Sequence, residues 1–364
     1  MSNIKRTIGI IEGEGIGPEI VKAAHACLSA VEQISSERFS YIWYDGPAPT
    51  QRKELDTAYE GLKSFYADAR DQGGVILRSS LYASLVYRLR TEFNMLYKLI
   101  CLEPVSMLSD ISPLKNDIAN KIKLLLVRDN AQGLYHGDES LTIGSEGKRT
   151  VTLTSKYEED KIQEIARIAF TLANQNRKRL ILLIKGDVLT KLADLWLDVF
   201  QSVGKQFPQV SFDWDHPDPG LTDLFIRPEE FDVVVALDVD ADIIGDFLAG
   251  LLHGTRAITP SGNFDPASKF ASYQTIHGSA DSLAHQNKAN PIGMIMAAAM
   301  LLELSFDMPQ AATIIRTATM EVLREGYRTS DIFPRDSKLH KLVGTKEMTD
   351  LIVHAMRKQK RHNT

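Results

Sequence analysis

Short runs of apolar, often β-branched residues alternate along the chain with longer segments of helical periodicity. Strands are predicted at residues 7–11, 74–77, 123–127, 179–184 and 231–237. Helices are predicted at residues 17–33, 161–175, 188–203, 241–252, 291–304 and 311–325. Such alternation is typical of an α/β sheet with helices on both of its faces.

Composition narrows the class of protein without choosing a function. The chain has 364 residues, enough for two or three compact units at roughly 100–200 residues each. A net charge of −5 gives no reason to expect a nucleic-acid partner, and no apolar run approaches the roughly 20 residues of a membrane span. Only two cysteines are present, and the N-terminal stretch lacks the features of a signal peptide. We therefore expect a cytoplasmic enzyme or binding protein.

A glycine-rich turn joins the first predicted strand to the first predicted helix. Its sequence is Glu12-Gly13-Glu14-Gly15-Ile16-Gly17-Pro18-Glu19. The glycines permit a close backbone approach, and the helix N-terminus could face an anion, although a plain tight turn explains the same residues. The spacing G-x-G-x-G differs from the dinucleotide fingerprint G-x-G-x-x-G, so the turn alone identifies no ligand.

Aspartates crowd the start of one predicted helix. Asp238, Asp240, Asp242 and Asp246 lie within LDVDADIIGD. Asp242 and Asp246 are four residues apart and share a helix face, where their charges repel each other unless a cation lies between them. Oxygen ligands suit Mg²⁺ or Mn²⁺, and Asp218 in the turn HPDPG is a candidate third ligand. Alternatively, the acids only complement the helix dipole.

The ends of two predicted strands carry candidate catalytic side chains. Lys185 follows an apolar strand, at the edge where open α/β sheets build their sites. Low-dielectric surroundings and a nearby metal disfavour its ammonium form, which suits a general base, but the lysine could equally reach solvent. Arg128 ends another strand seven residues before Tyr135. This pair could bind a carboxylate and donate a proton.

A polar loop precedes the long apolar helix. It contains His277-Gly278-Ser279-Ala280, followed by Asp281, and Asn290-Pro291 opens the helix. Such a loop could wrap a flat polar ligand, although a single histidine is more often structural.

Together and in this order, the motifs resemble the metal-dependent β-decarboxylating dehydrogenases, the isocitrate/3-isopropylmalate dehydrogenase family. The resemblance covers almost the whole chain. It begins at GEGIGPE, continues through Ser84, Arg90 and residues 100–104, and takes in Arg128, the Lys185 segment, the three aspartates and HGSA…ANP. Several independent motifs at the family's separations make the resemblance specific.

The resemblance implies an isopropylmalate dehydrogenase-like fold, with two open α/β domains and the active-site cleft between them. Residues 1–100 and 255–364 are expected to form the large cofactor-binding domain. Residues 101–254 are expected to form the small domain, which carries substrate and metal residues and the dimer interface. The family's shared active site implies a homodimer.

The resemblance also implies a role for each matching residue. Asp242 and Asp246, with Asp218 of the partner subunit, are expected to hold Mg²⁺ or Mn²⁺. Lys185 of the partner is expected to take the C2-hydroxyl proton as hydride leaves for the nicotinamide, and Tyr135 to protonate the carbon that loses CO₂. The expected substrate-binding residues are Ser84, Arg90, Glu103 and Arg128. The expected cofactor-binding residues are His277, Gly278, Ser279, Ala280, Asp281 and Asn290.

Two departures from the family pattern bear on the ligands. Glu103 in CLEP aligns with a substrate arginine, and an anion there would repel a substrate carboxylate. We therefore expect a malate-like 2-hydroxy acid other than isocitrate, with an altered or cationic C3 substituent. Asp281 stands near the position where NADP enzymes carry a Lys-Tyr pair and would repel a 2′-phosphate, which favours NAD over NADP.

Two functions of different classes fit these residues. The first is an oxidoreductase that oxidises the hydroxy acid, with or without β-decarboxylation to a 2-oxo acid. The second is a non-catalytic regulatory subunit or ligand-binding paralogue, which the changes at Glu103, Leu237 and Ala241 favour. The presence of Tyr135 and Lys185 favours the enzyme, because a binding protein has no chemical need for an acid and a base.

Overall fold

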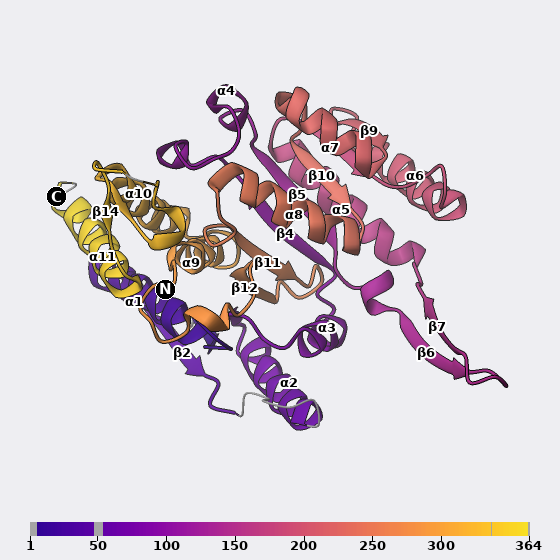
Figure 1. The fold of residues 1–364 in the computed structure, drawn as a ribbon, viewed down its shortest axis with the longest axis horizontal. Helices are drawn as coiled ribbons and strands as arrows, with labels where there is room; N and C mark the ends of the chain where they lie inside the picture. The colour runs from indigo at the N-terminus through magenta and orange to yellow at the C-terminus, as the bar shows by residue number, and fades with distance from the viewer. Residues whose placement is uncertain (1–5, 47–53, 336, 363–364) are drawn as a thin grey trace.

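A ten-stranded mixed sheet runs through the molecule, with helices on both faces (Figure 1). The computed structural model describes residues 6–46, 54–335 and 337–362. In spatial order, the strands of the sheet are β2 (Phe39–Trp43), β1 (Arg6–Ile11), β3 (Val75–Arg78), β12 (Ala271–Thr275), β11 (Pro260–Phe264), β4 (Tyr97–Leu102), β5 (Leu124–Asp129), β10 (Val233–Ala236), β8 (Arg179–Leu183) and β9 (Ser211–Asp215). The predicted α/β class is confirmed.

The sheet consists of two parallel groups of strands joined by an antiparallel centre. Strands β2, β1, β3 and β12 form one parallel group, and β5, β10, β8 and β9 form the other. Between them, β11 is antiparallel to both β12 and β4, and β4 is antiparallel to β5. The predicted domain boundaries near residues 100 and 255 fall at this junction. Because hydrogen bonding continues across it, the division into two domains stays a prediction.

One face of the sheet is covered along its whole length by helices. These are α1 (Gly17–Ile34), α5 (Glu159–Gln175), α6 (Thr190–Gly204) and α9 (Ile292–Leu304), and α10 (Pro309–Arg324) and α11 (Thr345–His362) pack outside α9 and α1. The strand residues that face them include Ile10, Val127 and Val235. Helix α9 lies against β11 and β12 and also packs on α1 and α10, so its almost continuously apolar sequence is buried on all sides.

The opposite face is covered in two separate places. Helices α2 (Leu55–Asp71) and α3 (Ala83–Glu92) cover β1 and β3 around Ile11 and Ile76. Helices α7 (Pro217–Ile226) and α8 (Asp238–His253) cover the side of β4, β5 and β10 around Ile100 and Leu126. The two apolar clusters do not merge. Between them, the central strands present polar side chains.

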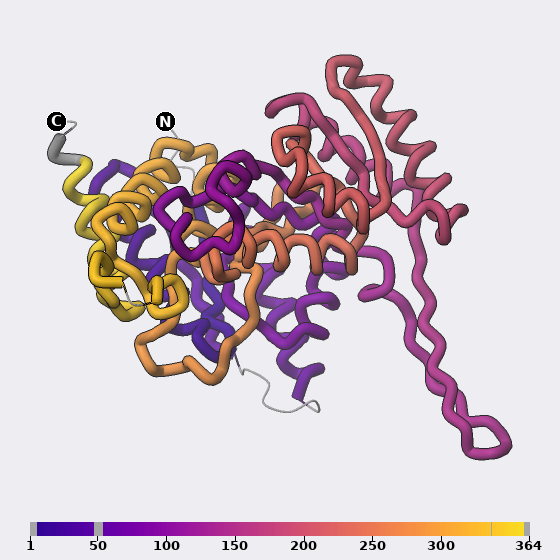
Figure 2. The backbone as a smooth tube through the Cα atoms, turned by 45° about the horizontal axis from the view of Figure 1, so that its top comes forward, coloured from indigo at the N-terminus to yellow at the C-terminus, as the bar shows by residue number. Residues whose placement is uncertain are grey.

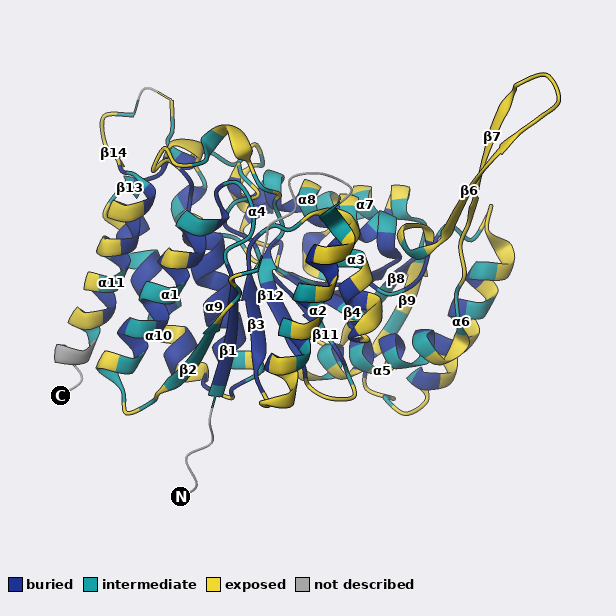
Figure 3. Ribbon diagram, turned by 90° about the horizontal axis from the view of Figure 1, so that it is seen from below, coloured by how far each residue is buried: buried dark blue, intermediate teal, exposed yellow. Residues whose placement is uncertain are grey.

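The smaller elements complete the chain. They are α4 (Asn116–Ala119), β13 (Tyr327–Arg328), β14 (Lys341–Leu342) and the short 3₁₀ helices Ser106–Leu108, Leu134–His136, Pro228–Glu230, Asp281–Leu283 and Ser330–Ile332. Strands β6 (Asp138–Ile143) and β7 (Arg149–Thr154) form a hairpin, here called the arm, that projects from the body (Figure 2). Every residue of its two strands is exposed (Figure 3). Among the described residues, no helix has the length and apolar character needed to cross a bilayer.

The predicted strands and helices are all present, with shifts of a few residues at their ends. The predictions missed strands whose sequences lack an apolar run, such as β11 (PSGNF) and β12 (ASYQT). The polar residues of these strands are buried nonetheless, and hydrogen bonds such as those of Asn263 with Asn130 and Ser272 with Tyr66 satisfy them. Tertiary position here overrides the local signal.

A substitution in α8 tests how closely this helix approaches the sheet. A Cβ atom at Gly245 would lie 2.8 Å from Ile100 Cδ1, so we expect Gly245→Val to overpack the interface and lower the free energy of unfolding by about 1–3 kcal/mol. On the same helix, a Cβ atom at Gly250 meets nothing within 4 Å, so Gly250→Ala should stabilise the helix by about 0.5–1 kcal/mol. Urea denaturation of both variants measures the difference, and equal stabilities contradict the close packing.

Candidate functional site

A cavity of about 140 Å³ lies in the polar gap between the two apolar clusters. The end of β3, one face of α3, strands β4 and β5, helix α8 and the segment from the end of β12 to residue 277 supply its walls. Its charged lining residues are Arg78, Arg90, Lys98, Arg128 and Asp242. Four side chains are cationic and one is anionic, so the cavity suits an anionic ligand.

Sheet register brings two of the cations face to face. Lys98 of β4 lies directly opposite Arg128 of β5 in the antiparallel pair. Their residues are 4% and 1% exposed, and Arg90 of α3 is 5% exposed. Like charges directly opposite each other destabilise a sheet, and a buried charge without a partner costs several kcal/mol. Nothing in the packing requires cations here, so we infer that they serve a ligand.

Burial and mutual repulsion change the pKa values of these groups. The pKa of Lys98 is held well below its usual range by burial, and then by the charges of Arg128 and Arg90. Burial, followed by the charge of Arg128, lowers the pKa of Arg90 to about 9. Asp242 and Asp246 act in the opposite direction on Lys98, but less strongly. A ligand carboxylate that enters the cavity would offset the repulsion among these cations.

Arg128 and Arg90 keep hydrogen-bond donors free for such a ligand. Arg128 pairs through Nη1 with Asp242 and donates from Nη2 to the Tyr87 hydroxyl at 2.9 Å. Its Nε, and the Nε and Nη1 of Arg90, are buried without a hydrogen-bond partner in the described part of the chain. Buried donors are usually satisfied, so these three atoms mark where a carboxylate can bind.

Tyr135 is held beside the cavity through its backbone. Its N–H donates to Asp238 Oδ2 at 2.8 Å, and Asp238 itself is buried at the start of α8. The loop can approach this carboxylate because Gly133 has a φ of +95°, and a Cβ atom there would lie 2.6 Å from Asp238 Oδ1. The Tyr135 residue remains 40% exposed. Burial, and then the charge of Asp242, raises the pKa of its hydroxyl, so it stays protonated at neutral pH.

The three predicted metal ligands do not meet within one chain. Asp242 and Asp246 lie one turn apart on α8, as predicted, and pair with Arg128 and Arg256 respectively. Asp218 lies on α7 instead, bonded to Lys185. Among the described residues, no three His, Cys, Asp or Glu side chains are grouped closely enough to hold a metal. The two α8 carboxylates fit Mg²⁺ or Mn²⁺ by their oxygen donors but require a further ligand.

Lys185 lies outside the cavity and differs from the expected base. Its Nζ donates to Asp218 Oδ1 at 2.9 Å and lies 3.5 Å from Asp187. The hydrogen bond to Asp218 raises the pKa of Lys185 and lowers that of Asp218. In the single chain, neighbouring acids thus stabilise the ammonium form, and the expected lowering of the lysine pKa beside a bound metal stays a prediction.

The predicted cofactor loop packs against the glycine-rich turn. Ile16 N donates to Ser279 O at 2.9 Å, and Gly15, with a φ of +59°, leaves no space for a Cβ atom beside that oxygen. Ser279 Oγ donates to Asp281 at 3.1 Å. Burial, and then the charge of Asp281, raises the pKa of Glu14. The turn's glycines thus serve the contact between these two loops.

The first and the last of the predicted cofactor-binding residues, His277 and Asn290, lie in different surroundings. His277 lines the cavity, and Gly278, Ser279, Ala280 and Asp281 follow it along the loop. Asn290 is buried and serves the structure: its Oδ1 accepts the N–H of Ile292 at 3.0 Å, and its Nδ2 donates to Asp331 at 3.1 Å.

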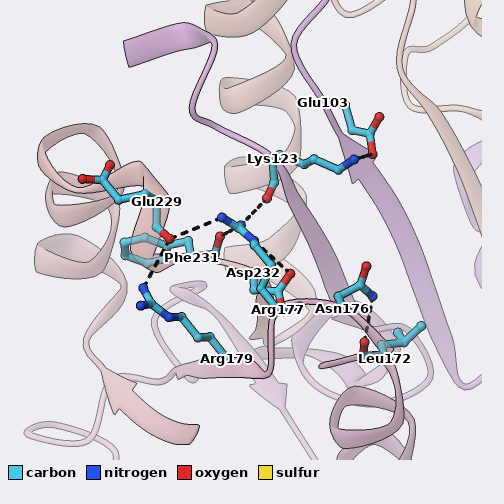
Figure 4. Close-up of polar contacts among 9 residues, drawn as sticks. All are labelled: Glu103, Lys123, Leu172, Asn176, Arg177, Arg179, Glu229, Phe231 and Asp232. Carbon is cyan, nitrogen blue, oxygen red and sulfur yellow. Dashed lines mark hydrogen bonds and ion pairs between the residues drawn. The ribbon is translucent and has the colours of Figure 1, made fainter. Parts of the chain in front are cut away.

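The structure does not bring Glu103 to the cavity. Glu103 follows the far end of β4 and pairs with Lys123 at 3.1 Å, with its side chain 56% exposed (Figure 4). The predicted contact between Glu103 and the substrate therefore has no support in this geometry, and neither does a cationic C3 substituent. Ser84 is also exposed and outside the lining of the cavity.

Sequence reasoning missed Lys98, the cation that β4 does contribute. The available signal was a single lysine in the otherwise apolar strand YKLICL. Tyr87 and Arg78 were missed as well, because no motif marked them. All three line the cavity.

Comparisons with known proteins place these residues in context. The model of the isocitrate/isopropylmalate dehydrogenase family matches residues 7–352. The 3-isopropylmalate dehydrogenase of Aquifex aeolicus is 31% identical, over 98% of each chain. That of Carboxydothermus hydrogenoformans is 32% identical, over 94% of this chain and 92% of its own. The crystal structure of isocitrate dehydrogenase from Methylococcus capsulatus superposes with a TM-score of 0.81 at 26% identity, covering 97% of this chain and 99% of that one.

The cost of the buried lysine is measurable as a pH dependence of stability. Because the pKa of Lys98 is lower in the folded than in the unfolded chain, its penalty is full below the folded value and disappears as pH rises toward about 10.4. We expect Lys98→Met to be more stable than the parent at pH 6 to 7, with the difference shrinking toward pH 10. Denaturation across this range measures it. Lys123→Met, which removes an exposed lysine, is the control, and parallel curves for Lys98→Met and the parent contradict the assignment.

Proposed function

The chain belongs to the isocitrate/isopropylmalate dehydrogenase family, and from that membership we propose that it oxidises a malate-like 2-hydroxy acid with NAD and decarboxylates it to a 2-oxo acid. The isopropylmalate dehydrogenases of this family use NAD and Mg²⁺ or Mn²⁺. The observation that carries the proposal is the group of buried cations Arg90, Lys98 and Arg128, which faces a cavity beside Asp242. A carboxylate receptor next to a metal-binding carboxylate is what this chemistry needs.

We assign substrate binding to the cations and proton delivery to Tyr135. Arg90 and Arg128 offer free N–H donors to a substrate carboxylate, and Lys98 adds a third positive charge. Tyr135, protonated at neutral pH, is held beside the cavity, and its hydroxyl would deliver the proton to the carbon that loses CO₂.

The metal and the base are proposed to come from two chains. Asp242 and Asp246 of one chain, with Asp218 of the partner subunit, would hold the Mg²⁺ or Mn²⁺. When bound, the metal would polarise the C2 oxygen of the substrate, and NAD would accept the hydride. Lys185 of the partner would take the proton of the C2 hydroxyl. Within one chain, Lys185 and Asp218 are adjacent, so a second chain could deliver both together.

Exposed apolar surface supports a homodimer. On α7 and α8, Ile226, Ile243 and Phe247 are 66%, 60% and 49% exposed. On the arm, Leu141 and Ile143 are 58% and 68% exposed. Apolar surface of this extent usually marks an interface, and a second copy of the chain would cover it. This surface includes α7, which carries Asp218.

A non-catalytic, ligand-binding role is the second candidate. The pairing of Lys185 with Asp218 is the specific observation in its favour, because a charged lysine is no base. The enzymatic proposal accounts for this pairing if a metal that binds Asp218 displaces Lys185 from it.

Turnover tests the two candidates directly. We expect the purified protein, with Mn²⁺ and NAD, to reduce NAD on at least one member of a panel of 3-isopropylmalate, isocitrate, malate and tartrate, with release of CO₂. Lys185→Ala should lower kcat at least about 100-fold, because it removes the general base. Lys123→Ala, an exposed lysine remote from the cavity, should leave kcat unchanged. Absorbance of NADH gives the rates with NAD and with NADP. No turnover on any substrate and no Mn²⁺ binding favour the binding protein.

Mixed dimers test whether the site is shared. Lys185→Ala and Asp242→Ala should each be inactive, but mixing and refolding them together should restore about one quarter of the parent activity, because half of the dimers are mixed and each has one intact site. If Lys185 serves its own chain, every site in the mixture carries a defect. Continued inactivity of a mixture shown to contain mixed dimers therefore contradicts the shared site.

A further inference from the structure

We propose that Tyr87 is a positioning residue for this reaction: its hydroxyl orients Arg128 for the substrate carboxylate, and its ring holds Tyr135 in place. The inference rests on the proposed function for the role of Tyr135. Its part concerning Arg128 requires only that the cavity bind a carboxylate. Tyr87 belongs to α3, three residues before Arg90 on the same face of the helix, and lines the cavity.

The hydroxyl of Tyr87 completes the support of Arg128. Arg128 donates from Nη2 to Tyr87 Oη at 2.9 Å, while its Nη1 pairs with Asp242. With both terminal nitrogens held, the plane of the guanidinium is set, and its free Nε has a defined direction. Without the hydroxyl, only the Asp242 contact remains to orient the group.

The side chain of Tyr87 also contacts two buried cations. The guanidinium of Arg90 lies over the ring, with Cζ 4.7 Å from the centroid, in a cation–π contact. Arg128 meets the same side chain at its hydroxyl oxygen. A neutral side chain therefore stabilises both arginines by different atoms. Tyr87 thus holds two like charges in one cavity without adding a charge of its own.

The ring of Tyr87 also contacts the loop that carries Tyr135. The rings of Tyr87 and Tyr135 meet edge to face, with centroids 5.6 Å apart at 73°. The ring of His136 meets Tyr87 at 5.0 Å and 66°, and its Nδ1 lies 3.3 Å from Thr91 Oγ1, one helical turn along α3. Helix α3 thus contacts two consecutive loop residues.

His136 supports this arrangement as a neutral ring. Burial, followed by the charges of Arg90 and Arg128, lowers the pKa of His136 to about 4. At neutral pH it therefore adds no further cation. Since Asp238 holds only the backbone of Tyr135, the aromatic contacts with Tyr87, together with the Arg128 guanidinium 5.7 Å from the Tyr135 ring centroid, fix its side chain.

Two substitutions at Tyr87 separate the hydroxyl from the ring. Tyr87→Phe keeps the ring contacts and removes the support of Arg128, so we expect it to weaken malate binding and raise KM about tenfold, with kcat within about twofold of the parent. Tyr87→Leu removes both, so it should show the same KM effect and lower kcat by about a further tenfold. If Tyr87→Phe retains the kcat that Tyr87→Leu loses, the ring of Tyr87, and not its hydroxyl, is the part that supports kcat.

Tyr59→Phe is the matched control. Tyr59 also donates its hydroxyl to a charged group of α3, Glu92 at 3.2 Å, and also carries an arginine over its ring, Arg88 at 3.7 Å. It lies on α2 outside the lining of the cavity. The same chemical change there should leave KM and kcat unchanged, which separates a general effect on α3 from an effect on Arg128.

Two further measurements make the outcome decisive. Isothermal titration of the Mn²⁺-loaded protein with malate reports on Arg128 without turnover, so weaker binding by Tyr87→Phe supports its part of the proposal even if no substrate reacts and the proposed function fails. In D₂O with 3-isopropylmalate, whose product carries one hydrogen and one deuterium on the protonated carbon, the parent should place deuterium on one face of that carbon, and Tyr87→Leu on both faces, because its Tyr135 is no longer held. If Tyr87→Leu does not fold, His136→Ala is measured instead, because it loosens the same aromatic contacts. The same loss of kcat is then expected of His136→Ala.

Several results overturn the proposal. Unchanged malate affinity in Tyr87→Phe removes the role of the hydroxyl, as does an equal loss in Tyr59→Phe. Equal kcat values for the phenylalanine and leucine variants, with deuterium still on one face, remove the role of the ring. If the parent binds no member of the panel of 3-isopropylmalate, isocitrate, malate and tartrate, both this proposal and the proposed function are contradicted.

Discussion

The arrangement of side chains around the cavity depends on the free-energy cost of burying positive charge on the central strands. Lys98 and Arg128 face each other across β4 and β5, and Arg90 joins them from α3, all nearly inaccessible to water. Such charges repel each other and lose their hydration, so the native state keeps them only if something else compensates. Asp242 offsets one of them, and Tyr87 contacts two. The remaining N–H donors of the arginines can bind an anion. Binding of that ligand would therefore stabilise the folded chain.

The architecture explains how such a site can exist inside a well-packed molecule. One face of the sheet is closed by helices along its length, whereas the other is covered by two helix pairs with separate apolar clusters. Between these pairs, the central strands β4 and β5 carry polar residues that line the cavity. Local rules of strand composition fail at this place, as expected where a fold accommodates a functional site. The close packing elsewhere holds the charged groups in position.

A second constraint comes from surface left uncovered. The single chain contains one group of residues around the cavity and another, Lys185 with Asp218, outside it. Apolar side chains of α7, α8 and the arm remain exposed. An assembly that covers this surface could also unite the two groups, which is the reason for proposing a shared site. The same association would change the charge surrounding Lys185, because a metal would compete for Asp218.

The sequence by itself determined what depends on neighbours a few residues apart. Apolar periodicity identified the buried strands and helices, the four-residue spacing put Asp242 and Asp246 on one helix face, and Arg128 was expected at a strand end. Tertiary structure alone decided which side chains meet in the cavity. Lys98, and not Glu103, reaches Arg128, because pairing between β4 and β5 sets which end of the strand lies at the cavity. Such register depends on contacts between distant segments, and no local pattern in the chain encodes it.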